Sequence, residues 1–422
     1  MGTEAGLGDG GTGGLGETGP SLPVSPSPRL PVRNMKAAKR LSILQVLEKG
    51  LFSTGSVVQM FQLARGLAGR GHRVAIVSRP EGQVPEEARR EGLEFIALAL
   101  KHEFDLASAR RLAKVFDDRA VDVVHAHKGI AHSIALFATY FSRRRPVLVV
   151  NRGVSFPLDV FNRIKFHVRM DAAVTVCEDI KNVIVSSGRL PPGKVNVIYA
   201  GVDLGRFDPE KTDRERVRRE WGVSAGDTLL VQVGAREWKG WKHLISASAL
   251  LAEEFPRLKT AIVACEDDAK KAEVSAFARE RGIEDRVLPI GFRSDMPDVL
   301  AASDIVADLS YEGLGITGTL REAMALGKPV VGSAAGGNPE LVVDGQSGIL
   351  VPPRDPAAVA AAVRRLVGDP ALAARLGRGG RARVEAGFSS EVRLDRIEAL
   401  YARLIAERAR GGASGRETAA GT

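Results

Sequence analysis

The chain has 422 residues, 44% of them hydrophobic and 26% charged, with 60 Lys and Arg, 51 Asp and Glu, and a formal net charge of +9. This composition excludes a fibrous or wholly disordered chain, and the length accommodates two or three domains with full-sized cores. Two cysteines in apolar contexts exclude a disulfide scaffold and a cysteine-based zinc cluster. The positive charge predicts acidic partners such as nucleotides, phosphorylated sugars, anionic lipids or nucleic acid. Part of it falls on arginines scattered along helix faces, where solvation is the simpler explanation.

The two ends of the chain differ in composition from the rest. Residues 1–35 consist mainly of Gly, Ser, Pro and Thr, so they form a predicted disordered leader, and Met35 offers an alternative start. Residues 410–422 form a similar predicted tail. No apolar run approaches the roughly 18 residues of a spanning helix, and the start lacks the layout of a signal peptide. We therefore expect a cytoplasmic protein.

The first half alternates short β-rich runs with helical patterns such as Ser56–Gly69. The predicted strands are Leu41–Leu47, Val74–Ser78, Val121–Ala126, Val147–Val150 and Ala173–Val176. Short apolar strands alternating with helices predict a parallel, doubly wound sheet. The polar segment Gly201–Glu220 interrupts the series, so the first domain is predicted to span residues 36–205.

A second alternating series begins at Thr228. Its predicted strands are Leu229–Val233, Lys259–Val263, Arg286–Leu288, Ile305–Asp308, Pro329–Gly332 and Gly348–Val351. Asp355–Pro356 and Asp369–Pro370 each pair an N-cap with a first-turn proline. An apolar stripe along Ser390–Arg408 predicts a last helix. The predicted fold is α/β, with two Rossmann-like doubly wound domains and a C-terminal helix. The second domain covers 206–388, and the helix covers 389–409.

Gly-rich turns follow several predicted strands, where open α/β sheets bind ligands. The turn Gly50–Ser56 has the glycine spacing of a Walker A loop, but Ser56 stands where that loop needs lysine. This disfavours a nucleotide-hydrolysing loop and leaves a tight turn before a helix as the alternative. The turn Gly336–Val342 also permits close ligand approach, although by itself it is a weak signal.

The segment Tyr311–Glu322 contains Gly-x-Gly-x-x-Gly between a strand and a helix. A dinucleotide site would need an acidic residue about 20 positions later, at the end of the next strand. That strand ends without one, so the dinucleotide interpretation fails. The amides from Gly315 to Thr319 remain as a helix N-terminus suited to a diphosphate. Glu312 and Glu322 flank it and can bond the hydroxyls of a sugar or ribose.

Cations follow the strand Leu229–Val233. Arg236 and Lys239 lie at its carboxyl end, where they can neutralise a diphosphate during bond cleavage. Alone, this cluster fits solvated surface cations better. Together with a diphosphate-binding helix in the same domain, it favours a catalytic role.

The stretch Asp304–Pro352 combines these features in one order. It runs through Glu312-Gly-Leu-Gly, Glu322-Ala-Met-Ala-Leu-Gly-Lys-Pro, Gly336-Gly-Asn-Pro-Glu340 and Asp344-Gly-Gln-Ser-Gly. This succession resembles glycosyltransferase family 4, a group of retaining enzymes with the GT-B fold. The resemblance covers roughly residues 41–408. It implies that the two domains face each other across a cleft and that helix 389–409 packs back toward the first.

The resemblance implies transfer of a sugar from a nucleotide diphosphate-sugar bound between the domains, with no metal and no resident cofactor. The first domain would bind the acceptor and the second the donor. The implied catalytic residues are His127, Arg236, Lys239 and Glu312. The implied nucleotide-sugar-binding residues are Gly55, Gly315, Ile316, Thr317 and Glu322. Arg236 and Lys239 would hold the diphosphate, and Glu322 the ribose. Glu312 and His127 would face the transferred sugar, although a satisfied polar residue at a strand end is the simpler interpretation of His127.

Three departures from the family pattern affect these assignments. Nine residues separate Glu312 from Glu322, where relatives usually have seven, so either the loop bulges or another group replaces Glu312. The spacing after Arg236 leaves both Lys239 and Lys242 as candidates for holding the diphosphate. Ala264–Asp267 stands where relatives often carry a glycine-rich strand end.

The acceptor domain contains a mixed apolar and basic segment, Phe161–Met170, and a basic cluster, Arg143–Arg145. An ordinary packed helix with a solvated face is the simpler interpretation. The alternative is peripheral contact with the anionic inner face of the cytoplasmic membrane. It favours a saccharide or lipid-linked saccharide acceptor from lipopolysaccharide, exopolysaccharide or another envelope glycan. Nucleic acid is disfavoured because the few aromatic residues are not interleaved with basic ones.

Three functions compete. A retaining glycosyltransferase that works by front-face displacement ranks first. A nucleotide-sugar epimerase of similar fold and a non-catalytic sugar-nucleotide-binding protein are the alternatives.

Overall fold

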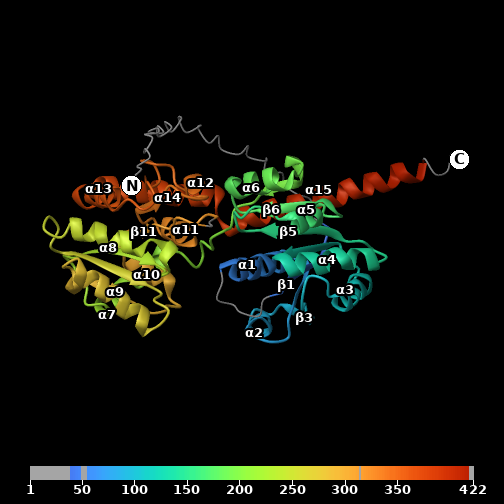
Figure 1. Cartoon of the computed structure of the whole chain (residues 1–422), viewed down its shortest axis with the longest axis horizontal. Coiled ribbons are helices and arrows are strands. Elements are labelled where there is room, and N and C mark those ends of the chain that lie inside the picture. The colour runs from blue at the N-terminus through green and yellow to red at the C-terminus, as the bar shows by residue number, and fades with distance from the viewer. Residues whose placement is uncertain (1–38, 49–54, 313–314, 418–422) are drawn as a thin grey trace, which may run out of the picture. The chain divides into compact units, whose positions relative to one another are not determined.

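The structure is a computed structural model that describes residues 39–48, 55–312 and 315–417, with side chains to Arg410. Contacts divide the chain after Ala38 into two units, and all described residues belong to the second, Lys39–Thr422 (Figure 1). The predicted leader 1–35 and the last five residues lie outside the described part of the chain. Residues 50–54 of the predicted Gly50–Ser56 turn also lie outside the described part.

The first sheet has seven parallel strands in the order β3-β2-β1-β4-β5-β6-β7. They are β1 (Ser42–Leu47), β2 (Arg73–Ser78), β3 (Glu94–Ala97), β4 (Val123–His127), β5 (Val147–Arg152), β6 (Ala172–Thr175) and β7 (Val195–Val197). The five predicted strands are all present. Strands β3 and β7 were not predicted, because these short edge strands lack the continuous apolar run of a strand buried on both faces.

The second sheet has six parallel strands in the order β10-β9-β8-β11-β12-β13. They are β8 (Thr228–Val233), β9 (Leu258–Val263), β10 (Val287–Pro289), β11 (Ile305–Asp308), β12 (Val330–Ser333) and β13 (Ile349–Val351). All six were predicted, because each is an apolar run bounded by turn residues. Two parallel α/β sheets confirm the predicted fold class.

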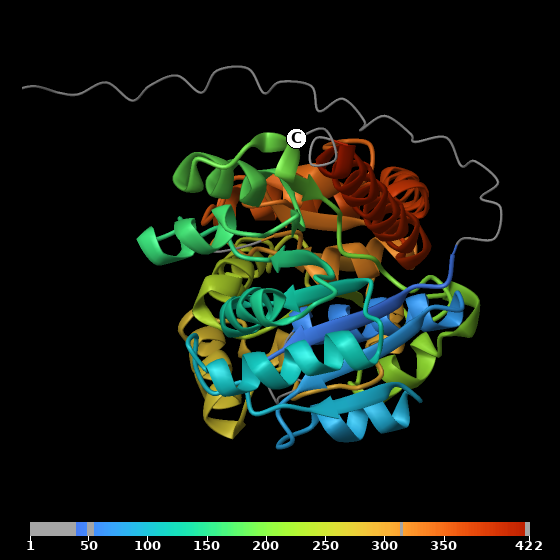
Figure 2. The same ribbon diagram turned by 90° about the vertical axis from the view of Figure 1, so that its right-hand side faces the viewer.

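Helices connect the strands and cover both faces of each sheet (Figure 1; Figure 2). In the first domain they are α1 (Gly55–Gly69), α2 (Val84–Arg90), α3 (Leu106–Asp118), α4 (Gly129–Phe141), α5 (Val160–His167) and α6 (Glu178–Gly188). In the second they are α7 (Arg214–Glu220), α8 (Trp241–Leu250), α9 (Asp268–Glu280), α10 (Met296–Ala302), α11 (Gly318–Ala325), α12 (Asn338–Leu341), α13 (Pro356–Gly368) and α14 (Pro370–Gly387). Asp355 and Asp369 accept hydrogen bonds from the amides of Ala358 and Leu372, as capping predicts.

The last helix, α15 (Ser390–Glu417), belongs to the core of the first sheet. Its predicted apolar stripe is buried there against α1, through Leu394, Ile397, Leu400, Tyr401 and Leu404. A Cβ added at Gly66 of α1 would lie 2.6 Å from Leu394 Cδ1, so the two helices approach closely because Gly66 has no side chain. The helix continues to Glu417, past its predicted end and into the segment expected to be a tail.

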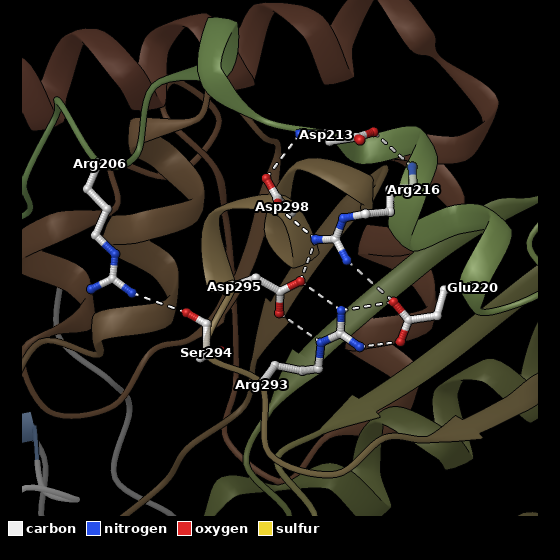
Figure 3. Close-up of polar contacts among 8 residues, drawn as sticks. All are labelled: Arg206, Asp213, Arg216, Glu220, Arg293, Ser294, Asp295 and Asp298. Atoms are coloured by element: carbon white, nitrogen blue, oxygen red, sulfur yellow. Dashed lines mark hydrogen bonds and ion pairs between the residues drawn. The ribbon is translucent and has the colours of Figure 1, made fainter.

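An ion-pair cluster fastens the loop before α10 to α7 (Figure 3). Arg293 binds both Glu220 and Asp295, and Arg216 binds Asp295 at 2.5 Å and Asp298 at 2.7 Å. Hydrogen bonds from these two guanidinium groups, of which that from Arg293 has the larger effect, hold the pKa of Asp295 well below its usual range. The cluster therefore orders the loop that follows the edge strand β10.

The turn after β9 contains a strained residue. Ala264 has a φ of +65°, in the left-handed region that costs a non-glycine residue about 1–2 kcal/mol. Its amide donates to the Gly291 carbonyl at 3.1 Å, which ties this turn to the segment after β10. An alanine therefore holds here a backbone geometry that glycine favours.

We predict that Ala264→Gly stabilises the protein by about 0.5–1 kcal/mol, because glycine adopts this φ without strain while also loosening the unfolded chain. The shift in the urea denaturation midpoint measures the effect. Ala261→Gly, at a buried β9 position of ordinary φ, is the control and lowers stability by about 1 kcal/mol. A midpoint that falls equally in both variants would contradict the assignment of strain to Ala264.

Candidate functional site

The strand orders define where ligands can bind. In the first sheet β1 lies between β2 and β4, and in the second β8 lies between β9 and β11. The chain therefore leaves neighbouring strands β1 and β4, and likewise β8 and β11, toward opposite faces. A crevice forms at the carboxyl ends of such strand pairs in open α/β sheets. Most of the residues predicted from the sequence lie at these four strand ends.

His127 is the last residue of β4 and is buried. Its Nε2 and Gln45 Oε1 lie 2.7 Å apart in a hydrogen bond, and its ring stacks on His125 with centroids 4.5 Å apart. Burial, together with the nearby positive charges of Arg393 and Lys128, lowers the pKa of His127 well below its usual range. A neutral imidazole at this place acts through hydrogen bonding rather than through a positive charge.

The residue after His127 has an unusual backbone. Lys128 has a φ of 80° and a ψ of 177°, a region that is nearly exclusive to glycine. This conformation turns the chain from β4 directly into α4. Strain of this kind concentrates at functional sites, where the surrounding structure maintains it.

Gly55 is the first residue of α1, which follows β1. It is exposed, and a Cβ added there would meet no atom of the described residues within 4 Å.

Lys239 connects the ends of β8 and β11. Its Nζ lies 3.3 Å from Asp308 Oδ2, and Asp308 is the fully buried last residue of β11. The backbone carbonyl of Lys239 accepts a hydrogen bond from Gln232 Nε2, and the aliphatic part of the Lys239 side chain lies over Gly234. Lys242 instead pairs with Glu237 and Glu273. Of the two competing lysines, only Lys239 lies at the strand ends.

Two other predicted catalytic residues are engaged at the surface. Arg236 forms an exposed ion pair with Glu266 at 2.7 Å. Glu312 forms an exposed ion pair with Arg354 at 3.2 Å, and Arg354 also covers the Tyr311 ring. The structure does not bring these two side chains into contact with Lys239. Exposed pairs of this kind contribute little stability, so a ligand can displace them at small cost.

The loop before α11 differs from the prediction at one amide. The Thr317 N–H, expected to be unpaired, donates to Asn338 Oδ1 at 3.2 Å, as does the Thr317 hydroxyl. Thr317 therefore does not cap its helix, and no described residue accepts from the amides of Gly318 and Thr319. The Thr317 amide is therefore not available to a diphosphate, and fewer amides can bind one than the sequence predicted.

The same loop packs against the first domain. A Cβ added at Gly315 would lie 2.5 Å from Val176 Cγ2, at the end of β6. Ile316 contacts the cores of both sheets. Gly315 therefore lets the backbone of this loop approach the first domain closely, and Ile316 packs between the two cores. Residues 313 and 314 lie outside the described part of the chain.

Glu322 lies in α11 and is partly exposed. Desolvation raises the pKa of its carboxyl, against the opposing effect of Arg321, Arg206 and Lys239. Within the described residues its carboxylate makes no hydrogen bond. An unengaged carboxylate at this position can accept hydrogen bonds from ligand hydroxyls.

Two residues near the site have roles that sequence reasoning missed. The Glu340 carboxylate accepts from the amides of Glu178 and Asp179 and from the Tyr199 hydroxyl, so it caps α6 of the first domain from the second. Its place in the Gly-Gly-Asn-Pro-Glu motif was the available signal. Arg321, beside Glu322, is buried, and its Nε and Nη1 form no hydrogen bond within the described residues. No motif pointed to it.

Two family models match the chain. Residues 213–383 match glycosyl transferases group 1, and residues 53–206 match glycosyltransferase family 4. The putative glycosyltransferase EpsD of Bacillus subtilis is 30% identical over 293 residues, 66% of this chain and 75% of that protein. The chain belongs to glycosyltransferase family 4. The resemblance drawn from the Asp304–Pro352 motifs is confirmed.

Other relatives agree with the family. The N-acetyl-alpha-D-glucosaminyl L-malate synthase of Bacillus anthracis is 26% identical over 71% of this chain and 79% of its own length. The D-inositol 3-phosphate glycosyltransferase of Mycobacterium bovis is 27% identical over 95% of this chain and 89% of that protein. This glycosyltransferase therefore aligns with relatives along both of its domains.

Solved structures share the fold. A glycosyltransferase from Rickettsia africae superposes with a TM-score of 0.78 at 21% identity, covering 87% of this chain and 99% of that one. Anabaena Alr3699/HepE in complex with UDP superposes with a TM-score of 0.75 at 20% identity, covering 86% and 100%. These similarities confirm the GT-B fold of this glycosyltransferase.

We predict that Lys239→Met lowers the free energy of unfolding by about 3 kcal/mol, because it leaves the buried Asp308 carboxylate without its cation. The double variant Lys239→Met, Asp308→Asn is expected to regain most of this loss. Thermal unfolding measures both.

Lys242→Met is the matched control, because its partly exposed ion pairs contribute about 1 kcal/mol or less. If Lys239→Met destabilises the protein no more than Lys242→Met, the Lys239–Asp308 pair has no structural role.

Proposed function

We propose that this glycosyltransferase moves a sugar from a nucleotide diphosphate-sugar to a saccharide or lipid-linked saccharide, with retention of anomeric configuration and without a metal ion. The second domain binds the donor and the first the acceptor. The observation that carries this proposal is the grouping, in the second domain, of Lys239, Glu322 and the first amides of α11, from which no described residue accepts a hydrogen bond. The group offers a cation and amides for a diphosphate and a carboxylate for ribose hydroxyls.

The proposed mechanism is front-face displacement. The bond between the anomeric carbon and the diphosphate breaks while the acceptor oxygen bonds to the same face. A diphosphate oxygen takes the acceptor proton. Lys239, Arg236 and the first amides of α11 stabilise the charge that develops on the diphosphate. Positive side chains thereby supply the charge that a metal ion supplies in other transferases.

Two residues orient the transferred sugar in this proposal. Neutral His127 exchanges hydrogen bonds with a sugar hydroxyl, supported by its low pKa and its position at the end of β4. Glu312 leaves its exposed pair with Arg354 and accepts from other hydroxyls. Both act through hydrogen bonds, so neither forms a covalent intermediate.

Donor binding can be tested by thermal unfolding with UDP, GDP, ADP and their sugar conjugates. A ligand at 100 times its dissociation constant adds about 2.7 kcal/mol of stability. We predict that one base family stabilises the protein and that Glu322→Gln removes most of this effect. Glu254→Gln, at a carboxylate exposed on the surface and paired with Arg364, is the control and leaves it unchanged.

Product analysis separates the three candidate functions. Transfer to an acceptor with retained anomeric configuration supports the proposal, and inverted products contradict the mechanism. Conversion of a nucleotide-sugar to its epimer without any acceptor favours the epimerase. Nucleotide-sugar binding without turnover favours the non-catalytic protein.

We further propose that the acceptor domain contacts an anionic membrane surface through the outer face of α5. This face consists of Val160, Arg163, Ile164 and His167, with Val160 71% and Ile164 57% exposed. Lys165, expected on the basic face, is instead buried and paired with Glu103 at 2.8 Å. Exposed apolar residues beside cations are typical of interfacial helices. No helix among the described residues is long and apolar enough to cross a bilayer.

The exposed surface extends beyond α5. Arg169 lies 3.5 Å from the centroid of the exposed Tyr140 ring at the end of α4, and Phe156 is exposed before α5. This combination supports an acceptor presented at the inner face of the cytoplasmic membrane, in envelope glycan synthesis. Two relatives are named for L-malate and D-inositol 3-phosphate, so a small anionic acceptor is the second candidate.

We predict that the double variant Val160→Ser, Ile164→Ser lowers the affinity for vesicles of anionic lipid, measured by cosedimentation, by about a hundredfold or more. Two fully buried apolar side chains contribute about 1.5–3 kcal/mol each, and each 1.4 kcal/mol is about a factor of ten. Leu250→Ser, at an equally exposed apolar residue of α8, is the control. Equal binding to anionic and zwitterionic vesicles, or equal loss in both variants, would contradict the proposal.

A further inference from the structure

Arg321 is a buried arginine for which no hydrogen bond is found among the described residues. It lies in α11, one position before Glu322, and is 3% exposed. Its Nε and Nη1 are buried and form no hydrogen bond. An uncompensated buried charge is costly, so such a group usually has a carboxylate or carbonyl partner.

Arg218, in the same domain, shows the usual arrangement. It is also 3% exposed, but its guanidinium donates to the carbonyls of Ala302, Ser224 and Asp227 and to Asp304 Oδ2, at 2.7–3.0 Å. Arg218 is therefore a structural residue whose donors are used. The comparison shows that burial alone does not explain the unused donors of Arg321.

The surroundings of Arg321 add positive charge. Arg393 of α15 is also buried, and burial together with the charge of Arg321 lowers the pKa of Arg393 to about 10. Arg393 donates to the carbonyl and side-chain oxygens of Gln59, both neutral. Glu322 is the carboxylate whose charge acts on Arg321, and it forms no hydrogen bond with it. In a low-dielectric interior this arrangement attracts an anion.

The guanidinium points to the start of its own helix. A Cβ added at Gly318 would lie 3.9 Å from Arg321 Nη2 and 3.7 Å from Glu322 Oε1. The amides of Gly318 and Thr319, which no described residue accepts from, lie in the same turn. Helix amides and a guanidinium together favour phosphate oxygens, which they bind through charge-assisted hydrogen bonds.

We propose that Arg321 and the first turn of α11 bind a phosphate group of the substrate pair. The inference rests on the proposed function only for the identity of that phosphate. Its source is either the donor diphosphate or a phosphate on the acceptor. Arg393 interacts electrostatically with Arg321 and raises the local positive potential.

Thermal unfolding of Arg321→Met and Arg218→Met tests this inference. Without ligand, Arg321→Met is expected to melt at or above the wild-type temperature, because an apolar side chain replaces an unpaired charge. Arg218→Met is expected to melt lower, because it leaves buried acceptors unpaired.

The ligand arm uses inorganic phosphate, pyrophosphate and the nucleoside diphosphate that stabilises the wild type, at constant ionic strength against chloride. We expect Arg321→Met to bind phosphate about tenfold to a hundredfold more weakly, as loss of a charged hydrogen bond predicts. Arg321→Lys is expected to recover part of that affinity, and Arg218→Met to retain it.

The outcomes separate the two sources. Weaker binding of the nucleoside diphosphate to Arg321→Met assigns the phosphate to the donor, and loss of inorganic phosphate binding alone assigns it to the acceptor. The inference is overturned if phosphate does not stabilise the wild type, if Arg321→Met binds every anion normally, or if it melts as low as Arg218→Met. Arg321-dependent phosphate binding without glycosyl transfer would contradict the proposed function and leave this inference intact.

Discussion

The site depends on one topological constraint, the reversal of winding between β1 and β4 and between β8 and β11. Parallel strands require crossover helices, and crossovers that leave toward opposite faces open a crevice at the strand ends. His127 ends β4, Asp308 ends β11, and α1 and α11 begin beside the same ends. Residues far apart in the sequence thus reach one edge of each sheet.

Buried charges then divide into those with partners and those without. Asp308 has Lys239, and Glu340 has the amides of α6 in the other domain, so both stabilise the fold through direct contacts. Within the described residues, Arg321 Nε and Nη1 form no hydrogen bond, and neither does the carboxylate of its partly exposed neighbour Glu322. A fold that leaves adjacent charges of opposite sign unengaged loses stability there, as is usual where a ligand must supply the missing partners.

Local periodicity predicted much of the structure. The six strands of the second sheet are within one residue of expectation, because each is an apolar run ended by turn residues. The edge strands β3 and β7 were not predicted, since a strand with one neighbour needs no continuous apolar run. In α5 the pattern misled: Lys165 points inward to Glu103 and Ile164 outward, because an ion pair satisfies the buried cation.

The sequence by itself determined the fold class, the family and the chemical types at the site, because apolar periodicity, capping and glycine spacing are local properties. Only the tertiary structure decided which groups are engaged. It pairs Glu312 with Arg354 and the Thr317 amide with Asn338. It places Lys239, rather than Lys242, against Asp308. Within the described residues it gives Nε and Nη1 of Arg321 no hydrogen-bond partner. These outcomes depend on distances between side chains on different elements, which strand order and helix packing set and no local pattern encodes.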